Sequence, residues 1–307
     1  MKYGFATKMM SNQIRTAMLK PAFLTFLLFT CFLAKGQTIA DSLLIDGHYR
    51  VFYFHTPKVK AGASLVFAMH GSGGRPQDMM ERAKKLESRA AGENFIIAYP
   101  AGYKRYWNEC RKASTAAANV ENIDEDAFFS GMIDYFKKHY KIDTKHVFAT
   151  GMSGGGHMAY RLGLTMPGKI KAFSAFVANL PTPENMDCPE SRMPVAAMII
   201  NGTADQVNPY EGGKVNTPGV TLGTVRAASQ SFQYWAALDG YKGEPVKSVL
   251  PDADTSNDIT VERYTYKKKG LPEVTLLKVI NGKHQFLTDI DVFEESWKFF
   301  KRQIEKK

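Results

Sequence analysis

An alternation of short apolar runs with helical patterns constrains the fold of this 307-residue chain more than any other feature. The runs are nearly continuous in apolar residues, which is typical of strands that are covered on both faces. They occupy residues 64–69, 95–98, 146–150, 172–177 and 195–200. Such strands alternating with helices predict an α/β fold with a mostly parallel central sheet and helices on both faces, in which sites form at the carboxyl ends of the strands.

Further elements extend this pattern toward both ends of the chain. The additional strands are expected at 42–45, 50–55, 261–266 and 274–280, and the helices at 124–140, at 224–238 and from an N-cap at Asp291 onward. Neither an internal repeat nor a low-complexity linker interrupts the sequence after the first 36 residues. We therefore expect residues 37–307 to form a single domain.

The first 36 residues have the composition of a secretory signal peptide. Arg15 and Lys20 precede an apolar stretch at 22–34 that is too short to span a bilayer, and small residues suited to cleavage follow it. The segment from Met18 already forms a complete signal, so translation could start there. Phe29 and Thr30 are bulkier than a lipoprotein signal usually allows before a cysteine, which argues against lipidation of Cys31. We expect a secreted or periplasmic protein without a membrane span once the signal is removed.

The charge and cysteine content of the mature chain are modest. The leader holds five basic residues and no acid, so its removal lowers the net charge from +10 to +5. This excess suits a solvated surface, and no nucleic-acid-binding motif accompanies it. Cys110 and Cys188 are the cysteines left in the mature chain, and in an oxidising compartment we expect them to pair. They lie too far apart in sequence for a CxxC metal or redox site.

Gly151-Met-Ser-Gly-Gly155 lies where the apolar run 146–150 gives way to a helical pattern at 156–164. A Gly-x-Ser-x-Gly at a strand-to-helix turn is the nucleophile elbow of α/β-hydrolases, which lifts the serine hydroxyl clear of the sheet. The five-residue pattern alone is weak, because about one chain in ten of this composition would contain it by chance. Ser153 is the candidate nucleophile, and it requires a base and an acid.

The order of the remaining polar residues suggests partners for Ser153. Among the seven histidines, His284 follows the last expected strand, where an α/β-hydrolase keeps its base. Asp205 follows the strand 195–200 and leads the candidates for the acid; a turn-stabilising carboxylate is the competing interpretation. Its competitors are Asp252, Asp254, Asp258, Asp289 and Asp291. The order serine, acid, histidine predicts a catalytic triad of Ser153, Asp205 and His284.

The tetrahedral intermediate of acyl transfer also needs hydrogen-bond donors. We expect one from the backbone of Gly154 and a second from Ser72 or Gly73, in the glycine-rich run His70-Gly-Ser-Gly-Gly after the strand 64–69; a plain glycine-rich turn is the alternative. Candidates for the substrate pocket are His70, Trp107 and His157. Trp107 suits packing equally well, and for His157 a satisfied buried ring is favoured over a pocket role.

Several motifs in register along the mature chain resemble the secreted polyhydroxybutyrate depolymerase and feruloyl esterase family, which is grouped with carbohydrate esterases. They are the His70 run, Tyr99-Pro-Ala-Gly, Trp107-Asn108, the segment 142–156 around Ser153, Asn201-Gly-Thr-Ala-Asp205, Pro209-Tyr-Glu-Gly-Gly213 and Gly282-Lys-His284. The resemblance covers about residues 47–304. It implies an α/β-hydrolase esterase with Ser153 as nucleophile, Asp205 as acid, His284 as base, and no metal or cofactor.

Two departures from the family accompany this resemblance. Family members usually have a glycine-rich approach to the base and Trp-Pro after it, whereas this chain has Asn281-Gly-Lys-His-Gln-Phe286. The difference bears on the leaving-group side of the pocket. The family often has further cysteines; if Cys110 and Cys188 pair, they would tie the Trp107 loop to the loop after Leu180-Pro181.

The leading hypothesis is a secreted serine esterase that removes feruloyl or acetyl groups from plant cell-wall polysaccharide or its fragments through an acyl-enzyme on Ser153. A polyhydroxyalkanoate depolymerase or a peptidase on the same fold would use the same chemistry. A carbohydrate-binding protein without catalysis is the alternative of another class. The acyl group, the alcohol and the oligomeric state do not follow from the sequence.

Overall fold

The computed structural model describes residues 37–55, 58–286 and 289–304, together with Met1. These residues other than Met1 belong to one compact unit, Gly36–Lys307. The predicted signal peptide, including Cys31, lies outside the described residues. In the part of the chain that the structure describes, no helix is both long and apolar enough to cross a membrane.

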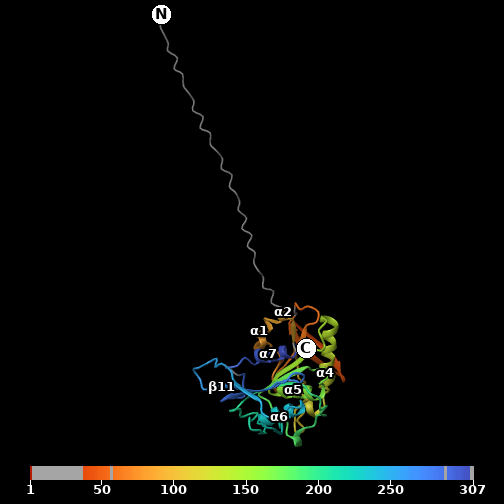
Figure 1. The fold of residues 1–307 in the computed structure, drawn as a ribbon. Helices are drawn as coiled ribbons and strands as arrows, with labels where there is room; N and C mark the ends of the chain where they lie inside the picture. The colour runs from red at the N-terminus through yellow and green to blue at the C-terminus, as the bar shows by residue number, and fades with distance from the viewer. Residues whose placement is uncertain (2–36, 56–57, 287–288, 305–307) are drawn as a thin grey trace. The chain divides into compact units, whose positions relative to one another are not determined.

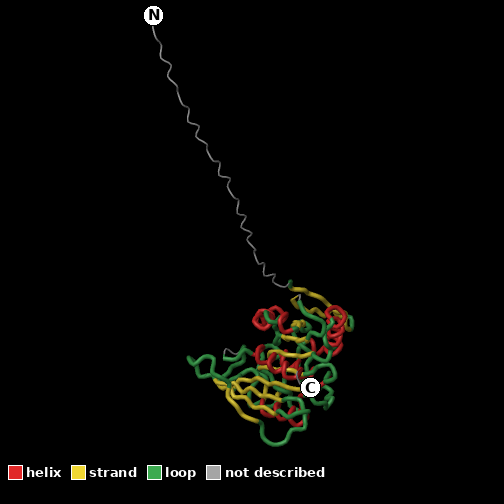
Figure 2. The backbone as a smooth tube through the Cα atoms, turned by 45° about the horizontal axis from the view of Figure 1, so that its top comes forward, coloured by secondary structure: helices red, strands yellow, loops and turns green. Residues whose placement is uncertain are grey.

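A ten-stranded sheet in the order β1-β2-β4-β3-β5-β6-β7-β12-β11-β10 forms the centre of the unit (Figure 2). Its middle is parallel, as predicted. Five of the six strands there are built from the five buried apolar runs, and the sixth is the strand predicted at 274–280. The parallel strands are β3 (Ser64–Met69), β4 (Phe95–Pro100), β5 (Val147–Met152), β6 (Ala172–Phe176), β7 (Ala196–Gly202) and β12 (Val274–Ile280). Their carboxyl ends meet at one edge of the sheet.

Both flanks of the sheet are antiparallel. On one side, β1 (Thr38–Ile45) and β2 (His48–His55) form a hairpin from two predicted strands, both longer than expected, and β2 pairs antiparallel with β4. The turn between them uses Asp46 and Gly47 with positive φ values of 45° and 78°, as a tight hairpin requires. On the other side, β11 (Thr260–Tyr266) pairs antiparallel with β12 and with β10 (Val246–Val249).

Helices cover both faces of the sheet and define two core layers (Figure 1). One layer holds α1 (Pro76–Glu87), α2 (Ala90–Glu93) and α7 (Val292–Ile304). The other holds α4 (Glu125–Tyr140), α5 (Gly154–Thr165) and α6 (Ala228–Leu238), with the short α3 (Ala117–Val120) in the preceding loop. Apolar burial on both faces explains why the central strands are almost continuously apolar.

The predicted helices are confirmed with one correction at a boundary. Asp124 caps α4 through Ala127 N, and Asp291 Oδ1 accepts from Glu294 N at the start of α7, at 2.9 and 3.0 Å. The helix predicted at 224–238 begins only at Ala228, because Thr224–Val225 form β9, which pairs with β8 (Gly213–Lys214) in a small separate sheet. The prediction did not include this hairpin, β10, α1 or the 3₁₀ turn Pro183–Asn185.

Candidate active site

Ser153 lies in a strained turn between β5 and α5. Its backbone has φ 51° and ψ −116°, a conformation that a residue with a side chain adopts only when the surrounding structure enforces it. The packing beneath the turn is equally tight, because a Cβ added to Gly155 would lie 2.2 Å from Met69 O at the end of β3. The turn therefore places the Ser153 hydroxyl at the carboxyl edge of the sheet, next to the segment that follows β3.

His284 lies within hydrogen-bond distance of both other predicted triad members. Its Nε2 is 3.0 Å from Ser153 Oγ, and its Nδ1 is 2.7 Å from Asp205 Oδ2. Because a carboxylate accepts, Nδ1 carries the proton and Nε2 presents its lone pair to the serine hydroxyl. The arrangement allows the ring to take the proton of Ser153 while Asp205 stabilises the positive charge that forms on the ring.

Asp205 is held by the turn that follows β7. Its side chain is only 1% exposed, and its second oxygen, Oδ1, accepts from the backbone N–H groups of Val207 and Asn208 at 2.8 Å each. Ala204 N donates to Gly282 O at 3.0 Å, which ties the turn to the loop that carries His284. Both carboxylate oxygens thus have partners, and one of them is directed at the imidazole.

The predicted oxyanion loop lies against the start of α5. A Cβ added to Gly154 would lie 2.8 Å from Ser72 N and 2.5 Å from Ser72 Oγ, so the two segments are in direct contact. The sequence left Ser72 and Gly73 as alternatives for the second donor. Gly73 N donates to Arg105 O at 2.9 Å, which leaves the N–H of Ser72 as the better candidate.

His70 and Trp107 are buried behind this loop. The side chain of His70 contacts the backbone through both ring nitrogens, and Trp107 Nε1 donates to His70 O at 2.9 Å. Each residue is 2% exposed, and their ring centroids are 4.9 Å apart. Both were candidates for the pocket, with packing as an equal alternative for Trp107; the structure places both as supports of the loop, without an exposed surface for a substrate.

His157 lies one helical turn after Ser153 and is also buried, at 3% exposure. Burial, together with the charges of Arg111 and His284, lowers its pKa well below the ordinary value, and the nearby Asn208 side chain opposes this shift. Nδ1 of the ring makes no hydrogen bond of normal geometry with any described residue, so the ring is buried as expected but not fully satisfied. It does not line an open pocket.

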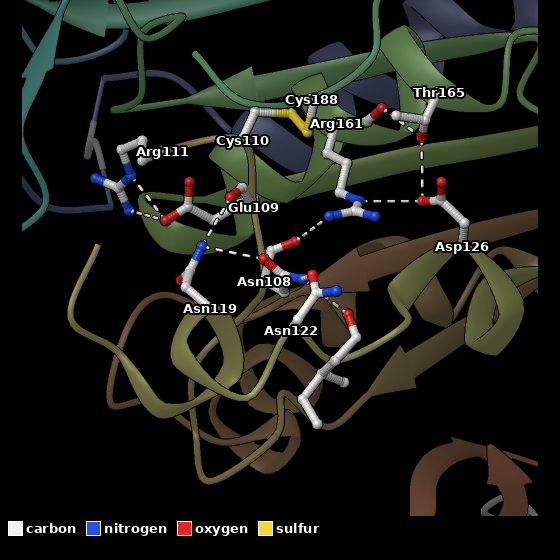
Figure 3. Close-up of a disulfide and its surroundings, with 11 residues drawn as sticks. Asn108, Glu109, Cys110, Arg111, Asn119, Asn122, Asp126, Arg161, Thr165 and Cys188 are labelled. Carbon is white, nitrogen blue, oxygen red and sulfur yellow. Dashed lines mark hydrogen bonds and ion pairs between the residues drawn. A yellow bond between two sulfur atoms is a disulfide. The ribbon is translucent and has the colours of Figure 1, made fainter. Parts of the chain in front are cut away.

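Cys110 and Cys188 form the predicted disulfide, with Cα atoms 4.9 Å apart (Figure 3). As expected, it joins the loop after Trp107 to the loop after Leu180-Pro181, and Asp187 N also donates to Cys110 O. Flanking the bridge, Glu109 and Arg111 form an ion pair at 2.6 Å with both side chains almost fully buried. Burial raises the pKa of Glu109 and the charge of Arg111 opposes it. The sequence analysis did not identify this pair, and the alternation of charges around a cysteine is its only signal in the sequence.

The curated relatives of this chain are esterases by name. NocK of Nocardia uniformis, named as an esterase, is 28% identical over 183 residues, which are 58% of this chain and 52% of NocK. The bifunctional acetylxylan esterase/xylanase XynS20E of Neocallimastix patriciarum is 28% identical over 57% of this chain and 24% of its own length. Feruloyl esterase C of Emericella nidulans is 29% identical over 48% of this chain and 51% of its own length. The chain thus spans about half of the length of these relatives, or less, and no family model matches it.

Solved structures show the same fold at low sequence identity. The acetyl xylan esterase of Aspergillus awamori superposes with a TM-score of 0.58 at 14% identity, covering 87% of this chain and 99% of that one. An S-formylglutathione hydrolase of Agrobacterium tumefaciens superposes with a TM-score of 0.54 at 13% identity, covering 88% and 96%. The predicted resemblance to esterases is confirmed, and the chain has the α/β-hydrolase fold.

Proposed function

We propose that this protein is a serine carboxylic ester hydrolase that works through an acyl-enzyme on Ser153. The observation that carries this proposal is the chain of contacts from Ser153 Oγ through the His284 ring to Asp205, at 3.0 and 2.7 Å. Serine, imidazole and carboxylate in this order are the groups that activate a hydroxyl for attack on a carbonyl. The esterase names of the sequence relatives support the same reaction.

The reaction begins when Ser153 Oγ attacks the ester carbonyl carbon and its proton moves to His284 Nε2. The N–H groups of Gly154 and Ser72 stabilise the negative charge that develops on the carbonyl oxygen. The carbon–oxygen bond to the alcohol then breaks, and the alcohol leaves with the proton from His284 Nε2. Water attacks the acyl-enzyme by the same route, with His284 again accepting the proton, and the free acid is released.

For the substrate, we propose feruloyl or acetyl esters of plant cell-wall polysaccharide or of oligosaccharides derived from it, hydrolysed outside the cytoplasm. The names of the relatives support these acyl groups, since they include feruloyl esterases and an acetylxylan esterase. The composition of the first 36 residues supports export.

Hydrolysis of methyl ferulate, an aryl acetate and acetylated xylan by wild type and by Ser153→Ala tests both the nucleophile and the substrate class. We expect kcat on every accepted ester to fall on the order of 10⁴-fold or more, because the nucleophile is removed. Ser88→Ala is the matched control, since this exposed hydroxyl donates only to Lys85 O at the end of α1. Equal hydrolysis by wild type and Ser153→Ala would overturn the nucleophile assignment.

Two further measurements separate the alternatives. A fluorophosphonate probe should label folded wild type at Ser153; no labelling would favour a carbohydrate-binding protein without catalysis. Hydrolysis of polyhydroxyalkanoate granules with no activity on any of the three esters would replace the proposed substrate class while retaining the mechanism.

A further inference from the structure

The His70 side chain makes two hydrogen bonds with the backbone of two different loops. Its Nδ1 is 2.8 Å from Gly71 O, and its Nε2 is 3.0 Å from Gly102 N. Gly71 begins the loop that contains Ser72, whereas Gly102 belongs to the loop after β4. The imidazole therefore connects the candidate oxyanion loop to a neighbouring segment of the carboxyl edge.

These contacts determine the protonation state of the ring. A backbone N–H can only donate, so Nε2 must present its lone pair to Gly102; a carbonyl can only accept, so Nδ1 must carry the proton that is donated to Gly71. Both hydrogen bonds exist together only in the neutral ring with the proton on Nδ1. A proton added to Nε2 would face the N–H of Gly102 and break that contact.

Two other contacts join the same pair of segments. Trp107 Nε1 donates to His70 O at 2.9 Å, and Gly73 N donates to Arg105 O at 2.9 Å. Ser72 thus lies in a short loop whose flanking residues, on both sides, are fastened to residues 102–107. Its contact with Gly154 depends on where this loop is held.

We propose that His70 is a positioning residue for the oxyanion site, which holds the Ser72 N–H beside Gly154 only while the imidazole is neutral and protonated at Nδ1. This inference rests on the proposed esterase function for its kinetic consequences, but the protonation state of the ring is independent of that function. Loss of the positioning should reduce stabilisation of the transition state more than binding of the substrate, because the negative charge on the oxygen develops only during the reaction.

The surroundings of His70 favour the neutral ring. Burial is the largest influence and lowers the pKa of His70, the Gly71 carbonyl and Asp78 of α1 oppose it, and Arg105 lowers the pKa further. The net shift is downward from 6.5, so the ring stays neutral until the pH falls below that value. The acid side of the pH dependence of activity should then contain a protonation step at His70.

Kinetics of three variants test the proposal. His70→Leu removes both hydrogen bonds, and we expect kcat to fall by about 10- to 100-fold with little change in KM, since a displacement of about 1 Å in a reacting group is sufficient for such a loss. His70→Gln keeps an acceptor for Gly102 N that does not titrate in this range, so it should retain more activity than His70→Leu. His146→Gln is the control, because the side chain of this histidine pairs with Asp143 near the surface, just before β5.

The acid limb of the pH profile distinguishes positioning from a general loss of stability. We expect log(kcat/KM) of the wild type to fall more steeply with decreasing pH than that of His70→Gln over part of the acid limb, because only the wild type has a ring that can be protonated at this position. A kcat of His70→Leu equal to that of the wild type, or acid limbs of the same shape in the wild type and His70→Gln, would overturn the proposal.

Nitrogen chemical shifts of the His70 ring provide a readout that needs no activity. The proposal requires protonated Nδ1, unprotonated Nε2 and a pKa below 6.5 in the folded wild-type protein. A ring protonated at Nε2 would overturn it even if His70→Leu does not fold. The esterase proposal fails separately, if the wild-type protein neither hydrolyses the esters nor reacts with fluorophosphonate.

Discussion

The Ser153 turn and helix α7 both pack against the central sheet, but they are stabilised in different ways. At the turn, Ser153 adopts a positive φ of 51°, and Gly155 lies so close to β3 that no side chain fits. In α7, Trp297 and Phe300 are almost fully buried on an amphipathic helix, while charged residues lie toward solvent. Backbone strain is thus concentrated where a hydroxyl must be presented, and apolar burial on the opposite face contributes the stability that tolerates it.

Of the changes that compare these two regions, Gly155→Ala should have the largest effect, because the added Cβ would lie 2.2 Å from Met69 O and 2.7 Å from His70 O. The backbone around Gly155 would have to move, and the turn that holds Ser153 would separate from the oxyanion loop. We expect kcat/KM on an aryl acetate to fall by at least about 100-fold and the free energy of unfolding to fall on the order of 4–5 kcal/mol. Gly168→Ala is the control, since its added Cβ meets no atom within 4 Å. Unchanged activity in Gly155→Ala would show that the turn is less constrained than its geometry indicates.

Trp297→Ala should destabilise the packing of α7 against the sheet without affecting the reaction. The indole is 1% exposed, and its ring centroid lies 4.1 Å from that of Phe95. We expect the free energy of unfolding, measured with denaturant, to fall by about 3–5 kcal/mol because a large cavity forms. At a temperature where the variant remains folded, kcat should equal that of the wild type. A proportional loss of kcat would mean that the two regions are coupled.

Glu93→Gln should produce a smaller, pH-dependent effect beside α7. Burial alone would raise the pKa of Glu93, but hydrogen bonds from Trp297, Lys301 and Arg89 outweigh it and lower the pKa from 4.5 to about 2. The stabilisation from Glu93 is therefore complete above pH 4.5 and is lost as the pH falls toward 2. Because Glu93 is partly exposed, we expect a loss of about 1 kcal/mol at pH 7.

Urea unfolding of wild type and Glu93→Gln between pH 3 and 7 checks the sign of this effect. The difference between the two proteins should shrink as the pH decreases. A difference that stays constant over this range would show that the ionised carboxylate is not what stabilises the contact. In either case kcat should remain unchanged, because Glu93 lies beside α7 and not at the Ser153 turn.

The sequence was sufficient to predict the elements that carry strong local signals. Strand β3 occupies the predicted residues 64–69, because a fully buried strand is apolar at every position. Asp291 was visible as a cap, and the helix predicted from Asp124 begins at its cap, since a short acidic side chain before an apolar helical pattern marks an N-terminus. Helix α1 has such a signal too, with Pro76 at its start and Met79, Ala83 and Leu86 at helical spacing. Its omission from the prediction was therefore avoidable.

Other features depend on partners that are distant in sequence. The pairing of β8 with β9 replaced the first turn of a predicted helix, because two-residue strands have no periodicity by which they can be recognised. The role of His70 could not be predicted either, and the sequence left that of Trp107 open between the pocket and packing. Their residue types suit a pocket, and only their contacts with Gly102 and with each other show that they support the loop.

The sequence by itself determined a strand, a turn and a helix around Ser153, and the order in which serine, acid and histidine occur. Tertiary structure alone decided the distances between them, since His284 lies 131 residues from Ser153 and 79 from Asp205 along the chain. Strands β5, β6, β7 and β12 are neighbours in the sheet in this order, so the loops at their carboxyl ends lie at one edge. This brings residues that are distant in sequence close together in space. Local patterns encode elements through periodicity and capping, whereas hydrogen-bond partners follow only from how those elements pack.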